Sequence, residues 1–133
     1  MDSNFIAIGE LARLSGLSTH TLRFYELAGV LKPISREANG HRRYQASDVL
    51  WLEFVLRLKL TGMPLAEIKQ YAALRSRGEP TLAARLALLK RHRERLAAQL
   101  NQLSDCADAL DKKIRNYRRL VGKAQATSRK PNP

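Results

Sequence analysis

Side chains that could react covalently or hold a metal are few in this sequence. It contains no nucleophile–base pair, phosphate-binding loop or metal-ligand cluster at a usable spacing, so we expect neither an enzyme nor a bound cofactor. The histidines His20, His41 and His92 have no second ligand at metal spacing. We expect His20 and His41 to make local polar or phosphate contacts, and His92 to lie on the surface.

Cys106 is the single cysteine, which excludes an intrachain disulfide. A sensor thiol would need a lowered pKa, usually from basic neighbours, but the nearest charges are Asp105 and Asp108. A small, half-buried helix residue is therefore the favoured interpretation, with an effector-sensing thiol as the alternative. A soft-metal sensor needs at least two thiolates, and one chain supplies one.

The first 30 residues predict a helix-turn-helix. Apolar residues follow a helical period over residues 7–15, and Gly16 provides a stop because glycine ends helices at little cost. Ser18 is a suitable N-cap for a second helix over residues 19–27, which ends near Gly29. Two short helices joined by a glycine-containing turn form this motif.

A basic hairpin is predicted next. Asn39-Gly40 is a strong hairpin signal, and the basic run of residues 41–44 follows it, as in the wing of a winged helix-turn-helix. Ser47 and Asp48 then begin a third helix that extends to about residue 61. Pro64 suits the first turn of a fourth helix, and residues 76–80 form a polar linker.

From Leu82 the apolar residues repeat with a period of 3.5, which is typical of a coiled coil. A helix of about 40 residues would be roughly 60 Å long, too long to bury this seam against the preceding domain, so we expect a second copy to cover it. Arg93 is the one charged seam position, where it either fixes the register or extends out to solvent. The seam comprises Leu82, Leu86, Leu89, Arg93, Leu96, Leu100, Leu103, Ala107, Leu110, Ile114, Tyr117 and Val121.

The formal net charge of +12 predicts a polyanionic partner. No apolar run approaches the roughly 20 residues that cross a bilayer, and the N-terminus lacks signal-peptide features. We therefore expect a cytoplasmic protein that binds nucleic acid and no membrane. Residues 1–80 carry 11 basic and 8 acidic side chains, whereas residues 81–133 carry 13 and 4, so the total charge does not locate the binding surface.

These segments, in this order, resemble the MerR family of bacterial transcription regulators, in a short form without a large effector domain. The resemblance covers residues 5 to about 75 closely, and the coil in architecture. The matching blocks are residues 8–12, 17–18, 21–26, 29–31, 42–44 and 58–68.

The resemblance implies a mainly α fold, with a winged helix-turn-helix over residues 5–75, a linker over 76–80, a dimerising antiparallel coiled-coil helix over 81–121, and a basic, disordered tail over 122–133. It further implies a homodimer that binds a pseudo-palindromic promoter. The dimer would bend and untwist a promoter spacer that is too long for RNA polymerase.

The resemblance also assigns residues to the DNA interface. Arginine suits this role because its planar fork grips guanine or phosphate. Phe24 departs from the usual tyrosine at its position and lacks the hydroxyl, while Lys59 matches a lysine near the distorted centre of the site. The implied contacts are Ser18, Thr19, His20, Thr21, Arg23, Phe24 and Tyr25 of the second helix, Arg42, Arg43 and Tyr44 of the wing, and Lys59.

The inducer cannot be named from the sequence. Trp51, Met63 and Tyr71 are candidates to line a small effector pocket between the third and fourth helices and the coil, and each is also a suitable core residue. Electrophile-sensing members often carry a cysteine near the third helix, but residues 48–56 contain none. The alternative function is an architectural DNA-binding protein without an effector.

Overall fold

The computed structural model describes residues 5–36 and 42–128. The predicted Asn39-Gly40 turn, His41 and the last five residues of the predicted tail lie outside the described residues. The chain divides into two compact units, residues 1–92 and residues 93–133, and each is described here by itself. Among the described residues, no helix combines the length and the apolar character needed to span a membrane.

The first unit begins with the predicted helix-turn-helix, formed by α1 (Ile8–Ser15) and α2 (Thr19–Leu27). Gly16 ends α1 with a φ of 75°, and its amide donates to the carbonyl of Ala12. A side chain at this left-handed position would be strained, so glycine suits the turn. The Ser18 side chain caps α2 by accepting from the amide of Thr21, as its position predicted.

The wing forms part of a three-stranded antiparallel sheet, whose order is β1–β3–β2. The strands are β1 (Phe5–Ala7), β2 (Ser35–Arg36) and β3 (Arg42–Gln45). β1 pairs with β3 from Phe5 opposite Gln45 to Ala7 opposite Arg43, which ties the start of the chain to the wing. β1 was not predicted from the sequence, because three residues before a helix show no alternation of their own.

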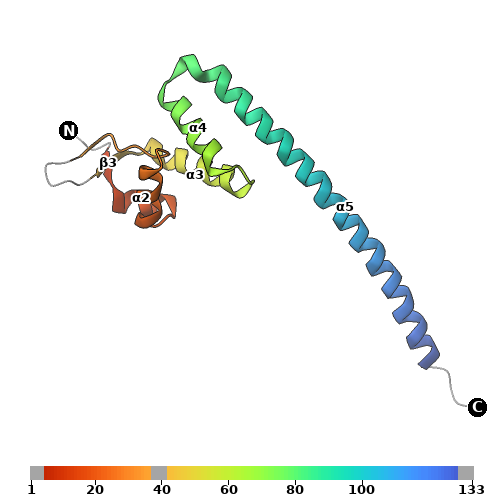
Figure 1. Ribbon diagram of the computed structural model, residues 1–133. Helices are drawn as coiled ribbons and strands as arrows, with labels where there is room; N and C mark the ends of the chain where they lie inside the picture. Colours follow the sequence, from red (N-terminus) through yellow and green to blue (C-terminus); the bar gives the residue numbers. More distant parts are fainter. Residues whose placement is uncertain (1–4, 37–41, 129–133) are drawn as a thin grey trace, which may run out of the picture. The chain divides into compact units, whose positions relative to one another are not determined.

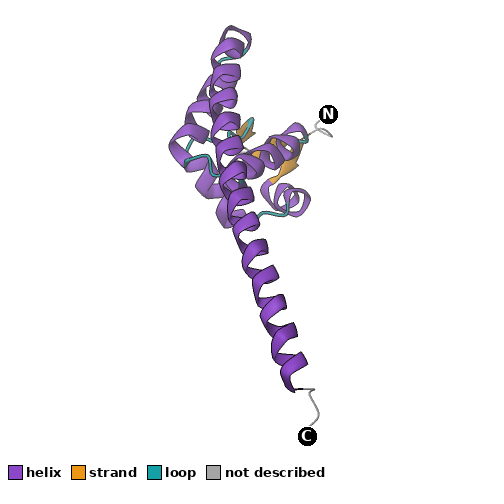
Figure 2. Cartoon of the chain, turned by 90° about the vertical axis from the view of Figure 1, so that its right-hand side faces the viewer, coloured by secondary structure: helices purple, strands orange, loops and turns teal. Residues whose placement is uncertain are grey.

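The two remaining helices of the predicted head are α3 (Ser47–Leu60) and α4 (Leu65–Ser76), which pack as neighbours (Figures 1 and 2). Asp48 stabilises the start of α3, since its carboxylate accepts from the Gln45 amide at 2.9 Å. Pro64 precedes α4 as its N-cap. A short 3-10 helix, η1 (Glu79–Thr81), occupies the end of the segment that was predicted to be an irregular linker.

One apolar core unites these elements. Trp51 fixes α3 against the chain that follows α2, because its indole N–H donates to the carbonyl of Val30 at 2.8 Å. The buried hydrophobic residues are Leu11, Leu22, Tyr25, Val30, Leu31, Tyr44, Trp51, Leu52, Val55, Leu58, Met63, Ile68, Ala72 and Leu88.

The long helix α5 (Leu82–Ser128) begins within the first unit. Leu88 and His92 are buried, whereas the seam residues Leu82 and Leu86 are each 55% exposed. The first turns of α5 thus contribute one face to the core and leave the predicted seam uncovered. The prediction that His92 lies on the surface is wrong, because the sequence alone did not reveal this second, inward face.

The second unit contains the rest of α5, from Arg93 to Ser128, and none of these residues is buried. The helix continues to Ser128, although the sequence analysis ended it at 121 and expected a disordered tail from 122. Lys123, Ala124, Gln125 and Ala126 explain the difference, because all four are good helix formers.

Candidate nucleic-acid interface

The exposed face of α2 carries the side chains best placed to enter a groove of DNA. His20, Arg23 and Phe24 are exposed, while Leu22 and Tyr25 face the core. The spacing of three and four residues places the exposed set on one side of the helix. Thr19 and Thr21 are half-buried at its first turn. Leu22 and Tyr25 thus anchor α2 to the core, and Arg23 and Phe24 present a cation and an aromatic ring to solvent.

Ser18 orders the beginning of this helix. Its hydroxyl oxygen accepts from the Thr21 amide, and its proton is donated to Thr21 Oγ1, both at 3.0 Å. The Ser18 hydroxyl is therefore occupied by the cap. Thr21 Oγ1 acts as an acceptor in this pair and retains its own proton, which can be donated to a DNA phosphate or base.

Tyr44 connects the wing to α2 from inside the protein. Its ring is completely buried, and its hydroxyl donates to Glu26 Oε2 at 2.8 Å. A direct DNA contact by Tyr44, as the sequence resemblance implied, is therefore wrong. The side chain instead sets the distance between β3 and the end of α2. The neighbouring Arg43 is half-buried.

Phe24 and Lys59 come together at one hollow, although 35 positions separate them in the sequence. The hollow has a volume of about 280 Å³, and Phe24 at its edge is 49% exposed. Tyr25 is only 5% exposed, so its ring serves as a wall of the hollow and as a core residue. The lining residues are Phe24, Tyr25, Lys59, Met63, Leu65 and Ile68.

An ion pair lies on the exposed surface of α1. Arg13 Nε donates to Glu10 Oε2 at 2.9 Å. This hydrogen bond lowers the pKa of the Glu10 carboxyl and raises the pKa of the Arg13 guanidinium. Because both groups are exposed, the pair contributes little to stability.

Two of the four candidate effector residues come together in the first unit. Trp51 and Tyr71 stack with ring centroids 5.8 Å apart at an interplanar angle of 12°. Met63 is buried and lines the hollow that contains Phe24 and Lys59, so it does not share a pocket with Trp51 and Tyr71. Cys106 is exposed on α5 in the second unit. Within residues 5–36 and 42–128, no three His, Cys, Asp or Glu side chains gather as a metal would require.

Comparison with known proteins identifies the family. The model for MerR HTH family regulatory proteins matches residues 6–74, and the model for MerR DNA-binding regions matches residues 49–120. The chain belongs to the MerR family. An HTH-type transcriptional regulator of Haemophilus influenzae is 35% identical over 104 residues, which are 78% of this chain and 77% of the relative.

Two crystal structures of MerR proteins have the same fold. A MerR family regulator from Listeria monocytogenes has a TM-score of 0.82 and 35% identity, with 92% of each chain covered. HiNmlR, a MerR family regulator that lacks the sensor domain and was crystallised on promoter DNA, has a TM-score of 0.74 and 31% identity, with 89% of this chain and 94% of that chain covered. The present protein is accordingly a DNA-binding transcriptional regulator of the MerR type and not an enzyme.

Some residues that organise this MerR head were absent from the sequence analysis. Glu26 accepts the hydrogen bond from Tyr44, and Thr61 contacts His92, with 2.7 Å between Thr61 Oγ1 and His92 Nε2. Arg75 lies over Trp51, with its guanidinium carbon 4.3 Å from the ring centroid. Each pair is 18 or more residues apart in sequence. No local pattern could have indicated these pairs, because they depend on how the helices pack.

Proposed function

We propose that two copies of this chain associate through α5 as an antiparallel pair and place their two heads on one promoter duplex. The main support is the apolar seam of the second unit, which remains exposed along its length. The exposed large seam residues of that unit are Leu100, Leu103, Leu110, Ile114, Tyr117 and Val121. A single helix has no means of burying such a stripe, and exposed apolar surface of this kind is typical of an interface.

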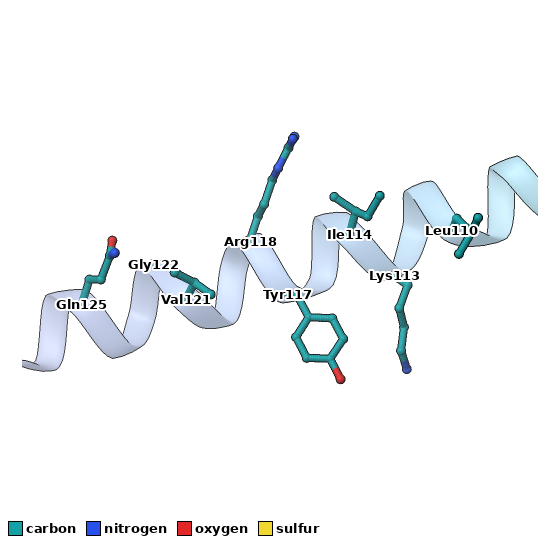
Figure 3. Close-up of a pocket in the computed structure, with 8 residues that line it drawn as sticks. All are labelled: Leu110, Lys113, Ile114, Tyr117, Arg118, Val121, Gly122 and Gln125. Carbon is teal, nitrogen blue, oxygen red and sulfur yellow. The ribbon is translucent and has the colours of Figure 1, made fainter.

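The last third of α5 illustrates this surface. Figure 3 shows eight of its residues between Leu110 and Gln125, all on one helix, with Lys113 beside Tyr117. The Lys113 ammonium lies 5.8 Å from the Tyr117 ring centroid. Because one helix supplies every lining residue, this is an open face and not an enclosed cavity. A second copy of the helix would close it.

Each head would read DNA with three elements. The α2 helix would enter the major groove with His20, Arg23 and Phe24, assisted by Thr19 and Thr21. The wing residues Arg42 and Arg43 would contact the backbone and the minor groove, and Lys59 would meet the phosphates near the centre of the site. Ser18 would act indirectly by ordering the first turn of α2. Two identical heads require a pseudo-palindromic site.

We further propose that binding bends and untwists the promoter spacer, so that RNA polymerase engages an altered DNA shape. The promoter-bound crystal structure of HiNmlR, a relative that lacks the sensor domain, supports the DNA contact. A small molecule or a stress signal would then shift the equilibrium between distorted and undistorted complexes. The alternative function is architectural binding without an effector.

A seam substitution with a matched control tests the dimer. Leu103→Lys places a charge in the seam, whereas Ala98→Lys places the same charge on the opposite side of α5. Light scattering and DNA titrations at micromolar concentration should show that the wild-type chain and Ala98→Lys are dimers that bind a full pseudo-palindrome. Leu103→Lys should be monomeric and bind the full site no better than a half-site. A monomeric wild type, or a dimeric Leu103→Lys, would contradict the proposal.

In vitro transcription tests the distortion. Promoters that differ only in spacer length are compared with and without the protein. Activation of the long spacer together with repression of a spacer of ordinary length supports untwisting. Equal effects on both promoters would contradict untwisting. The same assay with and without candidate inducers separates a responsive regulator from the architectural alternative.

A further inference from the structure

A second hollow lies on the first unit, formed by α3, α4 and the first turns of α5. Its volume is about 450 Å³. It is distinct from the hollow at Phe24 and Lys59, with which it shares no residue. Its lining residues are Ser47, Leu50, Trp51, Phe54, Tyr71, Arg75 and Arg85.

Three aromatic rings form the apolar part of this hollow. Trp51 and Tyr71 are stacked at 5.8 Å, and Phe54 lies 6.4 Å from Trp51 and 5.8 Å from Tyr71. Leu50, at the hollow's edge, is 69% exposed. An exposed leucine beside three clustered rings offers a surface on which a further planar ring could stack.

Two arginines supply the polar part. The Arg75 guanidinium lies over the Trp51 ring, with its central carbon 4.3 Å from the ring centroid. Arg85 is held in place because its Nε donates to Thr81 Oγ1 and its Nη2 to the carbonyl of Gly78, each at 3.1 Å. A guanidinium has five N–H groups, so donors remain for a ligand.

One acidic group offsets part of this charge. Asp48 is half-buried, and Arg75 acts on it electrostatically. Burial has the larger influence and raises the pKa of Asp48, while the Gln45 amide and Arg75 lower it. With two arginines and one aspartate, the hollow keeps a net positive charge that can attract an anion.

We propose that this hollow is a binding site for a small planar aromatic carboxylate. Trp51 is only 5% exposed, so the ring would stack on the half-buried Phe54 and Tyr71 beside it, and the carboxylate would accept hydrogen bonds from Arg85 and Arg75. A free phosphate would bind the arginines without contacting the rings, and a neutral arene would stack on the rings without accepting hydrogen bonds from the arginines. Only a ligand that carries both groups matches both halves of the site.

The site lies at the end of α3 opposite to Lys59, one of the proposed DNA-reading residues. Ser47 and Lys59 are 12 positions apart at opposite ends of α3, which corresponds to roughly 18 Å of helix. A ligand there would leave Lys59 free to contact DNA, and its binding would brace α3 against α4 and α5. The binding itself is independent of the proposed promoter distortion, whereas a role as inducer would depend on it.

The single tryptophan makes the site directly observable. Trp51 provides the only indole N–H of the chain, which is a single resolved signal in a ¹H–¹⁵N spectrum of the full-length protein. The probe is 2-naphthoate, titrated without DNA. Naphthalene-2-carboxamide retains the rings without the charge, and inorganic phosphate supplies charge without rings. Isothermal titration calorimetry gives the dissociation constants.

We expect a saturable shift of the Trp51 indole signal with 2-naphthoate, and binding at least about tenfold weaker for the carboxamide and for phosphate. Arg85→Gln should weaken 2-naphthoate binding at least about tenfold, because it removes a charge-assisted hydrogen bond. Arg77→Gln, at the exposed end of α4, should leave it unchanged. Arg75→Gln is the second variant, and it preserves the Thr81 and Gly78 contacts of Arg85.

The proposal is overturned if 2-naphthoate gives no saturable shift, if the carboxamide binds equally well, or if both Arg85→Gln and Arg75→Gln bind like the wild type. Phosphate binding as tightly as 2-naphthoate would assign the arginines to an anion site without an aromatic ligand, which also overturns it. DNA binding is measured separately on the same variants. Loss of naphthoate binding with DNA binding intact therefore leaves the proposed function unaffected.

Discussion

The contact between Thr61 and His92 gives the sharpest stability prediction. His92 is buried, and its Nε2 lies 2.7 Å from Thr61 Oγ1. The Thr61 hydroxyl donates to the carbonyl of Arg57 at 2.7 Å, and in this arrangement its oxygen accepts from the imidazole in the tautomer that carries its proton on Nε2. The other ring nitrogen, Nδ1, is buried and has no hydrogen-bond partner among the described residues. Thr61 is therefore the acceptor on which the buried ring depends.

Thr61→Val should remove this acceptor with little change in shape. A buried N–H left without a partner costs about 1–3 kcal/mol. For a unit of this size, about 2 kcal/mol corresponds to a decrease in Tm of roughly 10 °C. His92→Leu removes the imidazole together with its unpaired Nδ1, so it should lower the free energy of unfolding by less than Thr61→Val does. In the His92→Leu background, adding Thr61→Val should leave the free energy of unfolding nearly unchanged. The expected coupling energy is at least about 1 kcal/mol.

Urea unfolding followed by Trp51 fluorescence measures this cycle, with all variants at one protein concentration because dimerisation would make stability depend on concentration. Thr127→Val is the matched control. Its hydroxyl donates to the Lys123 carbonyl on the exposed end of α5, so its loss should cost under about 0.5 kcal/mol. If the two single changes at 61 and 92 are additive, or if Thr61→Val resembles Thr127→Val, the assignment of Thr61 as the essential acceptor is wrong.

Three further predictions concern the cap, a buried acid and the basic end of α5. Ser18→Ala should destabilise the first unit by about 1 kcal/mol in thermal unfolding and weaken DNA binding, because the Thr21 amide loses its acceptor; unchanged values for both would refute the role of the cap. Burial raises the pKa of Asp48, so the folded state holds the proton of this carboxyl more tightly than the unfolded chain does. The contribution of Asp48 to the free energy of unfolding therefore decreases as pH rises through its folded pKa. Asp48→Asn should remove this part of the pH dependence of the unfolding free energy and leave the contributions of the other acidic groups unchanged. The same pH dependence in the variant and the wild type would contradict the prediction. Deleting residues 122–133 removes three basic side chains and should weaken DNA binding and flatten the dependence of log affinity on log salt, through fewer released counterions; an unchanged slope would exclude a contact between these charges and DNA.

Much of the fold followed from local signals. Gly16 and Ser18 marked the turn between α1 and α2, Pro64 marked the start of α4, and the 3.5-residue repeat marked α5. These features are predictable because each depends on neighbours within one or two turns of helix. The small strand β1 was missed because its pairing strand, β3, lies almost 40 residues later.

The candidate site was less predictable, because exposure depends on packing. Phe24 and Tyr25 are adjacent aromatic residues in the sequence, yet Phe24 is exposed and Tyr25 is buried. Tyr44 stands in a basic run and nevertheless points inward to Glu26. The sequence alone offered no means of distinguishing a surface aromatic residue from a core one at these positions. His92 was mispredicted for the same reason, because the first turns of α5 have a buried face in addition to the exposed seam.

The association of two copies through antiparallel α5 helices is the central claim, and a spin-label distance tests it most directly. Cys106→Ser removes the only cysteine, and Arg119→Cys then places one label at an exposed position opposite the seam. If the seam is centred near residue 101, two antiparallel copies separate these labels by about 54 Å along the helix axis. Pulsed electron–electron resonance should give a distance of roughly 50–60 Å. A distance near 20 Å, as parallel helices would give, or no dipolar modulation at micromolar concentration, would contradict the account.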